Sequence, residues 1–334
     1  MILAGDFAPQ KSEWVLPDFG DETVLCNLEG PLCREGLPKI LKVGAHLHTL
    51  PGAFRGHWAF NLANNHIMDY TEKGLVATCE YLDSYGFPYC GAGCNQEEAH
   101  RPMWLEESGK KIAVIGCCEH QFGVSSDKAP GVAAIGEWIY DAIRDVRGKG
   151  ADVVIVSSHA GSESTRFVSP RLRSLYHDWI DSGADVIHGH HAHVPQGYEI
   201  YKSRPIFYGL GNFIIDRSDW ASNPDNRWSL IAYMDFNYST PRCRVEYYGD
   251  VPPHADEYME AAKAIFSDQE LLVREWQKTA IEQYTRFYKP YITFSLKGVL
   301  SRLRNPHRHA LLMQCFSSCE NHIDIINTAR GFSR

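Results

Sequence analysis

Short apolar runs alternate with longer amphipathic stretches along the first 250 residues. The apolar runs have the length of buried strands, and the stretch from Thr71 to Tyr85 carries apolar residues at helical spacing. The pattern predicts strands at Met1–Ala4, Thr23–Asn27, Trp58–Leu62, Met103–Glu106, Lys111–Cys117, Asp152–Ser157, Asp185–His188, Gly197–Tyr201, Pro205–Leu210, Trp228–Phe236 and Arg242–Tyr248. It predicts helices at Thr71–Tyr85, Gly136–Arg147 and Pro170–Ser182. Strands that alternate with helices in this way are typical of a layered α/β fold.

After about residue 250 the pattern becomes entirely helical, with helices predicted at Asp256–Tyr288, Leu296–Arg304, His307–Ser317 and Ile323–Thr328. Residues 286–334 hold eight Lys or Arg and two acidic residues, which gives +6 for this segment and −14 for the remainder. We therefore expect an α/β domain over residues 1–250 and a helical appendage over residues 251–334. The appendage is expected to pack its apolar faces on the core. The alternative is that it docks onto an anionic membrane face or an acidic partner.

Composition narrows the class of protein. Hydrophobic residues make up 44% and charged residues 22%, as in folded soluble proteins. The net charge of −8 argues against a nucleic-acid binder, and no apolar run approaches the roughly 20 residues that span a bilayer. The first residues lack the pattern of a secretory signal, so we expect a cytoplasmic protein whose ten cysteines are mostly small core residues or free thiols.

Residues with metal-binding side chains follow the predicted strands. Asp6, Glu29, Asn65 and His159 each come shortly after a strand, and a cluster of four histidines lies within residues 188–193. Ligand sites in layered α/β folds collect at the carboxyl ends of strands. A carboxylate can bridge two divalent ions, mixed oxygen and nitrogen ligands suit Mn, Fe or Zn better than Ca, and a separate histidine can protonate a leaving oxygen. These are the parts of a dinuclear hydrolase.

Seven short motifs share an order and spacing over residues 1 to about 216. They are Gly5-Asp6, Asn27-Leu28-Glu29-Gly30-Pro31, Leu62-Ala63-Asn64-Asn65-His66-Ile67-Met68-Asp69-Tyr70, Gly91-Ala92-Gly93, His159-Ala160-Gly161-Ser162-Glu163, Gly189-His190-His191-Ala192-His193-Val194 and Tyr208-Gly209-Leu210-Gly211-Asn212-Phe213. As a set they resemble the CapA family of capsule or poly-γ-glutamate biosynthesis proteins, which looks like a branch of the calcineurin-like metallophosphoesterases. The resemblance implies a layered metallophosphoesterase-like sandwich that binds one or two divalent ions.

The resemblance also implies roles for individual residues. Glu29 stands at the bridging carboxylate, where the wider superfamily has aspartate, and His66 at the non-ligating general acid. His191 and His193 match the final His-x-His, although His190 also follows Gly189, so this register stays open by one residue. The implied metal ligands are Asp6, Glu29, Asn65, His159, His191 and His193. The residues expected to support the ligands or the substrate are Asn64, Asp69, Glu163, His190 and Asn212.

The chain departs from the family pattern at two positions. Ala8 stands where the superfamily has a ligating histidine, which leaves the choice between one ion and two open, and Ala160 stands where the capsule family usually has tryptophan. The leading hypothesis is a phosphoesterase-like hydrolase that acts on a phosphorylated small molecule or polymer precursor in exopolymer biosynthesis. The alternatives are a non-catalytic metal-binding assembly factor and a metal-dependent amide hydrolase. The basic C-terminal helices could join the protein to a membrane-associated synthesis complex.

Overall fold

Two mixed β-sheets form the centre of the molecule. The computed structural model describes residues 1–9, 19–33, 36–40, 46–49, 54, 56–121, 123–215, 223–292, 300 and 306–331. The first sheet has the order β15-β14-β1-β2-β3-β4, with β13 also paired to β1, and the second has the order β11-β12-β10-β9-β7-β6. The first sheet consists of β1 (Ile2–Ala8), β2 (Thr23–Leu28), β3 (His57–Asn61), β4 (Tyr89–Cys90), β13 (Asn212–Ile215), β14 (Trp228–Asp235) and β15 (Arg242–Gly249). The second consists of β6 (Met103–Glu107), β7 (Lys110–Cys118), β9 (Val153–His159), β10 (Val186–His190), β11 (Tyr198–Tyr201) and β12 (Arg204–Phe207).

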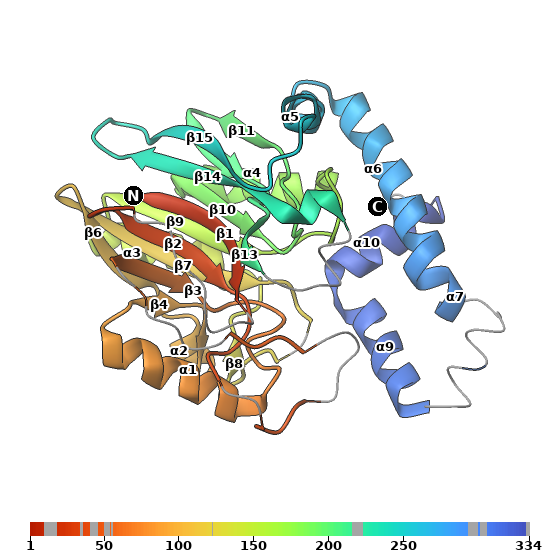
Figure 1. Ribbon diagram of the computed structural model, residues 1–334, viewed down its shortest axis with the longest axis horizontal. Coiled ribbons are helices and arrows are strands. Elements are labelled where there is room, and N and C mark those ends of the chain that lie inside the picture. The colour runs from red at the N-terminus through yellow and green to blue at the C-terminus, as the bar shows by residue number, and fades with distance from the viewer. Residues whose placement is uncertain are drawn as a thin grey trace.

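Apolar side chains fill the spaces between successive layers. Leu3 and Leu25 of the first sheet pack against Val114 and Ile155 of the second, so the two sheets face each other. The outer face of the first sheet is covered by α1 (Thr71–Tyr85), and that of the second by α3 (Trp138–Gly148) and α4 (Pro170–Asp181). The result is a four-layer sandwich, which confirms the predicted layered α/β fold (Figure 1). The remaining short elements are β5 (Ala92–Gly93), β8 (Gly131–Val132), α2 (Gln96–Ala99) and the 3-10 helix η1 (Pro224–Arg227).

Three strands extend at least two residues beyond the ends that the apolar pattern predicts, namely β1, β9 and β10. The run Met1–Ala4 predicts a strand that ends before Asp6, but β1 continues to Ala8, because its last residues pair with β13. The sequence pattern did not predict β13, which begins with the polar Asn212. In the same way, β9 runs through His159 and β10 through His190. Polar residues that were expected to follow the strands therefore lie on them.

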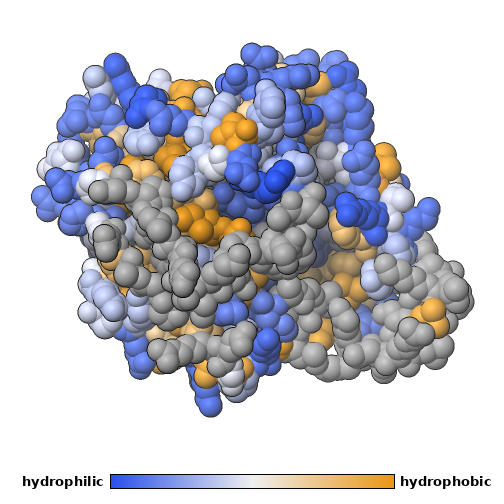
Figure 2. Space-filling view, in the orientation of Figure 1, coloured by the Kyte–Doolittle hydropathy of each residue, from blue (hydrophilic) through white to orange (hydrophobic). Residues whose placement is uncertain are grey.

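The C-terminal helices stand together at one side of the sandwich (Figure 1). Figure 2 shows a predominantly hydrophilic surface over α5 and α6, as expected of helices that turn their apolar faces inward. Ile265 and Leu272 join the core beneath the second sheet, while Trp276, Tyr288 and Ile325 form a smaller core among the helices themselves. The elements are α5 (Ala255–Ala264), α6 (Gln269–Gln283), the π-helix η2 (Tyr284–Tyr288), α7 (Lys289–Ile292), α9 (Pro306–Ser318) and α10 (Glu320–Ala329). The predicted helical appendage is therefore present.

Two further expectations concern the chain as a whole. All ten cysteines are free, as predicted. Among the residues that the structure describes, no helix combines the length and apolar character that a membrane span requires. Of the basic helix predicted at Leu296–Arg304, only residue 300 falls within the described ranges.

Candidate metal centre

The structure brings all six predicted ligands into one buried cluster at the carboxyl ends of strands from both sheets. The first sheet contributes through β1, β2 and β3, and the second through β9 and β10. His188 Nε2 lies 2.9 Å from the carbonyl oxygen of Ala4, so β10 and β1 are in direct contact behind the cluster. The buried residues are Asp6, Glu29, Asn65, His159, His191 and His193.

Two glycines allow the chain to close around the site. A Cβ at Gly5 would lie 1.9 Å from the carbonyl oxygen of Gly211, and that same oxygen accepts a 2.9 Å hydrogen bond from Asp6 N. Gly30 has φ +113 and turns the chain directly after Glu29. Larger residues at either position would push a ligand-bearing segment away from the cluster.

A first group of donors consists of Asp6, Glu29 and His193, whose ligand atoms all lie within 4.8 Å of one another. His193 Nδ1 is 3.3 Å from Asp6 Oδ2, and His193 Nε2 is 3.3 Å from Glu29 Oε1. Burial lowers the pKa of His193, but the negative charges of Glu29 and Asp6 outweigh it and raise that pKa well above the usual value.

A second group surrounds His159 Nε2. This atom lies 3.0 Å from Asn65 Oδ1, 2.9 Å from His191 Nδ1 and 3.8 Å from Glu29 Oε1. Burial, followed by the neighbouring imidazoles, lowers the pKa of His159 well below its usual value, so the ring is neutral and suited to ligation. Glu29 faces both groups.

The donor set and its spacing fit a divalent transition metal. Bonds of about 2.0–2.2 Å to one ion leave neighbouring ligand atoms roughly 3–3.5 Å apart, close to the separations in both groups. Glu29 is fully buried, and neither of its carboxylate oxygens accepts a hydrogen bond from the described residues. Burial raises the pKa of Glu29 above its usual range. A buried carboxylate without hydrogen bonds is expensive, and a bound cation would offset that energy.

The loop of residues 190–193, here called the histidine loop, favours His191 over His190 as the first histidine of the His-x-His pair. His190 Nε2 lies 3.3 Å from His188 Nδ1 and 3.4 Å from Ser157 Oγ on the strands, while its Nδ1 lies 3.5 Å from Asp6 Oδ1. His191 and His193 face the other predicted ligands, and both have positive φ, +89 and +58. Such a backbone costs of order 1–3 kcal/mol for each residue and is found mainly at functional sites. The geometry therefore favours His191 and His193 as the ligating pair.

His66 is held beside the two groups without entering either. Its Nδ1 donates to Asp69 Oδ2 at 2.7 Å, and its Nε2 lies 3.9 Å from Glu29 Oε1. Asn64 is fully buried and shapes this turn, since its Oδ1 accepts from the backbone N–H groups of His66 and Ile67. Asp69 therefore orients His66, and Asn64 has a structural role.

The other predicted supporting residues lie where they can act on the ligands. His193 Nδ1 donates to Asn212 Oδ1 at 3.0 Å, and Asn212 Nδ2 donates to the carbonyl oxygen of Asn226 at 3.0 Å. This contact leaves His193 Nε2 as the nitrogen that could bind a metal. Glu163 forms a third group with His191 and His193, again within 4.8 Å.

Two residues at the site were not predicted. Asn27 is fully buried; its Nδ2 donates to Asp6 Oδ1 at 2.8 Å and lies 3.1 Å from His159 Nδ1. Alternation along β2 was the available signal, since Asn27 and Glu29 are two residues apart and share a side of the strand. Gln121 Nε2 lies 3.3 Å from His191 Nε2, and its place in the loop after β7 left no pattern in the sequence.

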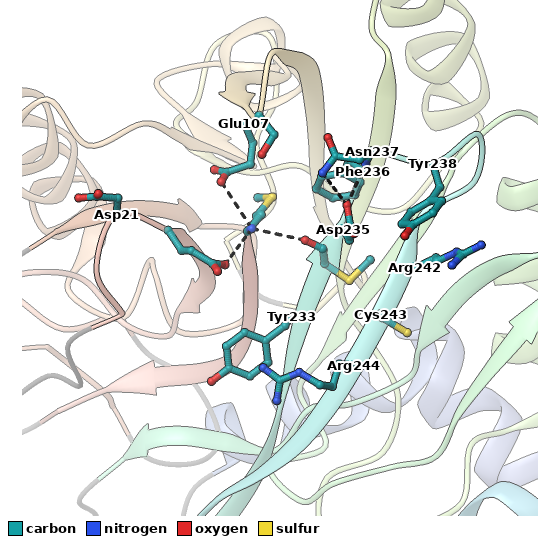
Figure 3. Close-up of a pocket in the computed structure, with 14 residues that line it drawn as sticks. Asp21, Glu107, Tyr233, Asp235, Phe236, Asn237, Tyr238, Arg242, Cys243 and Arg244 are labelled. Carbon is teal, nitrogen blue, oxygen red and sulfur yellow. Dashed lines mark hydrogen bonds and ion pairs between the residues drawn. The ribbon is translucent and has the colours of Figure 1, made fainter.

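A separate cavity of about 610 Å³ lies at the other end of β1 (Figure 3). The amino group of Met1 pairs there with Glu22 at 3.0 Å and with Glu107 at 3.5 Å. Tyr233 and Arg244 contribute to its walls, but none of the six candidate ligands lines it. The candidate metal centre is therefore separate from this cavity.

Comparisons with known proteins agree with the motif pattern. The model of the family described as bacterial capsule synthesis protein PGA_cap matches residues 17–217. The capsule biosynthesis protein CapA of Bacillus anthracis is 32% identical over 220 residues, which cover 62% of this chain and 53% of that protein. The PGA biosynthesis protein CapA of Bacillus subtilis (strain 168) is 31% identical over 230 residues, which cover 66% of this chain and 60% of that protein.

The match to these curated relatives spans between half and two thirds of their length. Among solved structures, a 5'-nucleotidase precursor from Thermus thermophilus matches with a TM-score of 0.31 and 18% identity, over 68% of this chain and 44% of that chain. A TM-score this low carries no argument about function.

Proposed function

Because the chain belongs to the bacterial capsule synthesis protein family PGA_cap, we propose that it is a divalent-metal-dependent, phosphoesterase-like hydrolase in the biosynthesis of capsule polysaccharide or poly-γ-glutamate. The observation that supports this proposal most directly is the Glu29 carboxylate. It is fully buried, faces both groups of donors, and accepts no hydrogen bond from the described residues. A carboxylate that bridges two cations has these properties.

The two groups divide the proposed metal ligands. Asp6, Glu29 and His193 would hold one ion, and the other would be held by Glu29, Asn65, His159 and His191. Bound divalent ions would polarise a phosphoryl oxygen and provide hydroxide near neutral pH. The mixture of nitrogen and oxygen donors favours Mn, Fe or Zn. Without cations, the neighbouring Asp6 and Glu29 carboxylates would repel a phosphate, so substrate binding should depend on metal.

His66 is the proposed general acid. Asp69 Oδ2 accepts both the 2.7 Å bond from His66 Nδ1 and a 2.6 Å bond from the backbone N–H of Leu47, so the carboxylate and the ring are fixed together. The negative charge of Asp69 favours protonated His66, whose Nε2 would donate its proton to the departing oxygen. The proposed substrate is a phosphorylated sugar, a nucleotide or a lipid-linked polymer precursor.

The proposal can be tested on the purified chain by measuring metal content and the turnover of an aryl phosphate and of a γ-glutamyl anilide. We expect at least one transition-metal ion per chain and turnover of the phosphate. His66→Asn should keep its metal and lose roughly 10²–10⁴-fold in turnover, the usual contribution of a general acid. His57→Asn, at an exposed position, is the matched control and should retain both properties. Loss of metal from His66→Asn would contradict the assigned role.

The second candidate function is a non-catalytic metal-binding assembly factor. Ala8 favours it, because the fully buried methyl group cannot replace the imidazole ligand of the superfamily pattern. This candidate predicts bound metal with turnover of neither substrate. Selective turnover of the γ-glutamyl anilide would instead identify a metal-dependent amide hydrolase. Association of the basic C-terminal helices with a synthesis complex stays a prediction.

A further inference from the structure

Glu163 lies on the loop that follows His159 and reaches the metal centre from its solvent side. Its carboxylate, one nitrogen of His191 and one nitrogen of His193 lie within 4.8 Å of one another. The residue is exposed, so this carboxylate is the accessible member of an otherwise buried donor set. Exposure removes most of the desolvation energy that would otherwise oppose placing a third negative charge beside Asp6 and Glu29.

The first group of donors has a deficit, and Glu163 can add a ligand to the centre. Among the described His, Cys, Asp and Glu residues, the group within 4.8 Å consists of Asp6, Glu29 and His193, and Ala8 offers no donor atom. Transition metals in proteins take four or more ligands, and a carboxylate oxygen suits the same ions as the imidazoles. We propose that Glu163 is a metal ligand of this centre, which it joins on the side formed by His191 and His193. This inference rests on the proposed metal-dependent function.

Main-chain contacts hold the Glu163 loop against the histidine loop. The backbone N–H of Ser164 donates to the carbonyl oxygen of Ala192 at 2.8 Å, and Ala192 lies between the two ligating histidines. Gly161 and Ser164 both have positive φ, +112 and +55, so the loop turns sharply on either side of Glu163. The carboxylate therefore starts from a backbone fixed to the segment that it would help to complete.

The C-terminal helices hold the other side of the same loop. Asn321 Nδ2 on α10 donates to the carbonyl oxygen of Gly161 at 2.8 Å, and Ser162 Oγ donates to Asn321 Oδ1 at 3.1 Å. Gln283 Nε2 on α6 donates to the carbonyl oxygen of Glu163 at 3.4 Å. The loop is thus clamped between the histidine loop and two helices, which limits the positions that the carboxylate can reach.

Charge effects agree with this placement. The negative charge of Glu163 is among the influences that raise the pKa of Glu29, after burial and the charge of Asp6. It also acts in the opposite direction to burial on His322 of α10, whose pKa is lowered chiefly by burial. Glu163 is therefore electrostatically close to both the bridging carboxylate and the helical wall.

The test is a titration of metal-free protein with Mn²⁺ by calorimetry, together with the visible absorption spectrum of bound Co²⁺, which reports ligand number and geometry. Glu163→Gln removes the charge at nearly constant shape, and Glu163→Asp keeps the charge on a shorter side chain. Glu282→Gln, an exposed glutamate on α6, is the matched control. Thermal unfolding of the metal-free proteins confirms that each variant is folded.

We expect Glu163→Gln to weaken the binding of one Mn²⁺ ion by roughly tenfold or more and to change the Co²⁺ spectrum. Even residues that only orient ligands contribute about 10–100-fold to metal affinity. Glu163→Asp should recover part of the affinity, and Glu282→Gln should match the wild type. An unchanged affinity and spectrum in Glu163→Gln would overturn this proposal while leaving the metal centre intact. A wild-type chain that binds no divalent ion would overturn the proposed function itself.

Discussion

The α/β sandwich and the C-terminal helices meet at the candidate metal centre, but they hold it in different ways. In the sandwich, ligands lie on or just beyond strands whose backbones are fixed by ladder hydrogen bonds; His159 and His190, for example, are direct partners in the pairing of β9 with β10. Side chains of the helices contact the site through the backbone of one loop. An example is the hydrogen bond from Asn321 on α10 to the carbonyl oxygen of Gly161, 160 residues earlier in the chain. Strand ends determine which side chains converge, and helices determine how firmly one loop is held.

The largest expected effect is at the shared carboxylate of the sandwich. Glu29→Gln should abolish metal binding, because both donor groups lose a charged ligand. It should leave the metal-free protein at least as stable as the wild type, since a buried carboxylate without hydrogen bonds becomes neutral. Thermal unfolding with and without a chelator measures both effects. At an ion concentration of 100 times Kd, binding adds about 2.7 kcal/mol to the wild type.

In the Glu29→Gln variant the chelator should leave the unfolding temperature unchanged. Glu22→Gln, at a half-exposed position of the same charge, is the control and should keep the wild-type response to chelation. A variant that still gains stability from added ion would show that Glu29 is not the bridging residue.

Asn27 tests the strand side of the comparison without removing a ligand. Asn27→Ala removes the hydrogen bond to Asp6 and the contact with His159, so metal affinity should fall roughly 10–100-fold. The buried partners left without hydrogen bonds should lower the free energy of unfolding by about 1–3 kcal/mol each. Calorimetric titration and urea unfolding measure the two losses. An affinity within twofold of the wild type would mean that the strand backbones alone position the ligands.

Much of the candidate metal centre was predictable because its residues occur in short motifs at strand ends. Parallel strands bring their carboxyl ends to one edge, so the sequence alone places Asp6, Glu29 and Asn65 together. The position of Asn27 could also have been predicted, because side chains alternate along β2 and Asn27 lies two residues before Glu29. The contact of Gln121 could not have been predicted, since a loop position depends on tertiary packing that no local pattern records.

The fold, like the site, was predictable where a local sequence pattern recorded it and not where distant contacts decided it. Apolar periodicity predicted most strands and the sandwich helices, with α1 matching its expected bounds, Thr71–Tyr85. It did not predict β13, where Asn212 and its neighbours pair with the end of β1 because of contacts made far along the chain. Nor could it predict that α10 would pack against the loop after His159, since an amphipathic helix indicates a buried face but not its partner.

Asn321 tests the helical side. Asn321→Ala removes its two hydrogen bonds with the Gly161–Ser162 segment and should weaken metal binding severalfold, less than Asn27→Ala, because the main-chain bond from Ser164 to Ala192 remains. Asn327→Ala, on the same helix, is the matched control. The comparison of the two regions predicts this order of effects in a metal titration. An effect of Asn321→Ala equal to that of Asn27→Ala would make the helices as important to ligand placement as the strands.

The smallest effect at the metal centre is expected from Glu199, which joins the sandwich to the helices away from the site. Its carboxylate accepts hydrogen bonds from Arg173 at 2.9 Å and from Tyr208 at 2.6 Å, and Arg173 also donates to the carbonyl oxygen of Phe266 beyond α5. Burial alone would raise the pKa of Glu199, but the hydrogen bonds from Arg173, Tyr208 and His177 together outweigh it and lower that pKa.

A carboxyl group whose pKa is lower in the folded than in the unfolded protein stabilises the fold fully above its unfolded pKa, here the ordinary value of 4.5. That contribution is lost as the pH falls through the lower, folded value. The free energy of unfolding of the wild type should therefore decrease as the pH falls below about 4.5. Glu199→Gln should be less stable by about 1.5–3 kcal/mol near neutral pH, because Arg173 loses a charged partner, and it should show a flatter dependence in acid. Urea unfolding at a series of pH values measures both, and Mn²⁺ affinity at neutral pH should stay within twofold of the wild type. A loss of metal affinity comparable to that of Asn321→Ala would show that the junction between sandwich and helices, and not only the loop contact, sets the geometry of the centre.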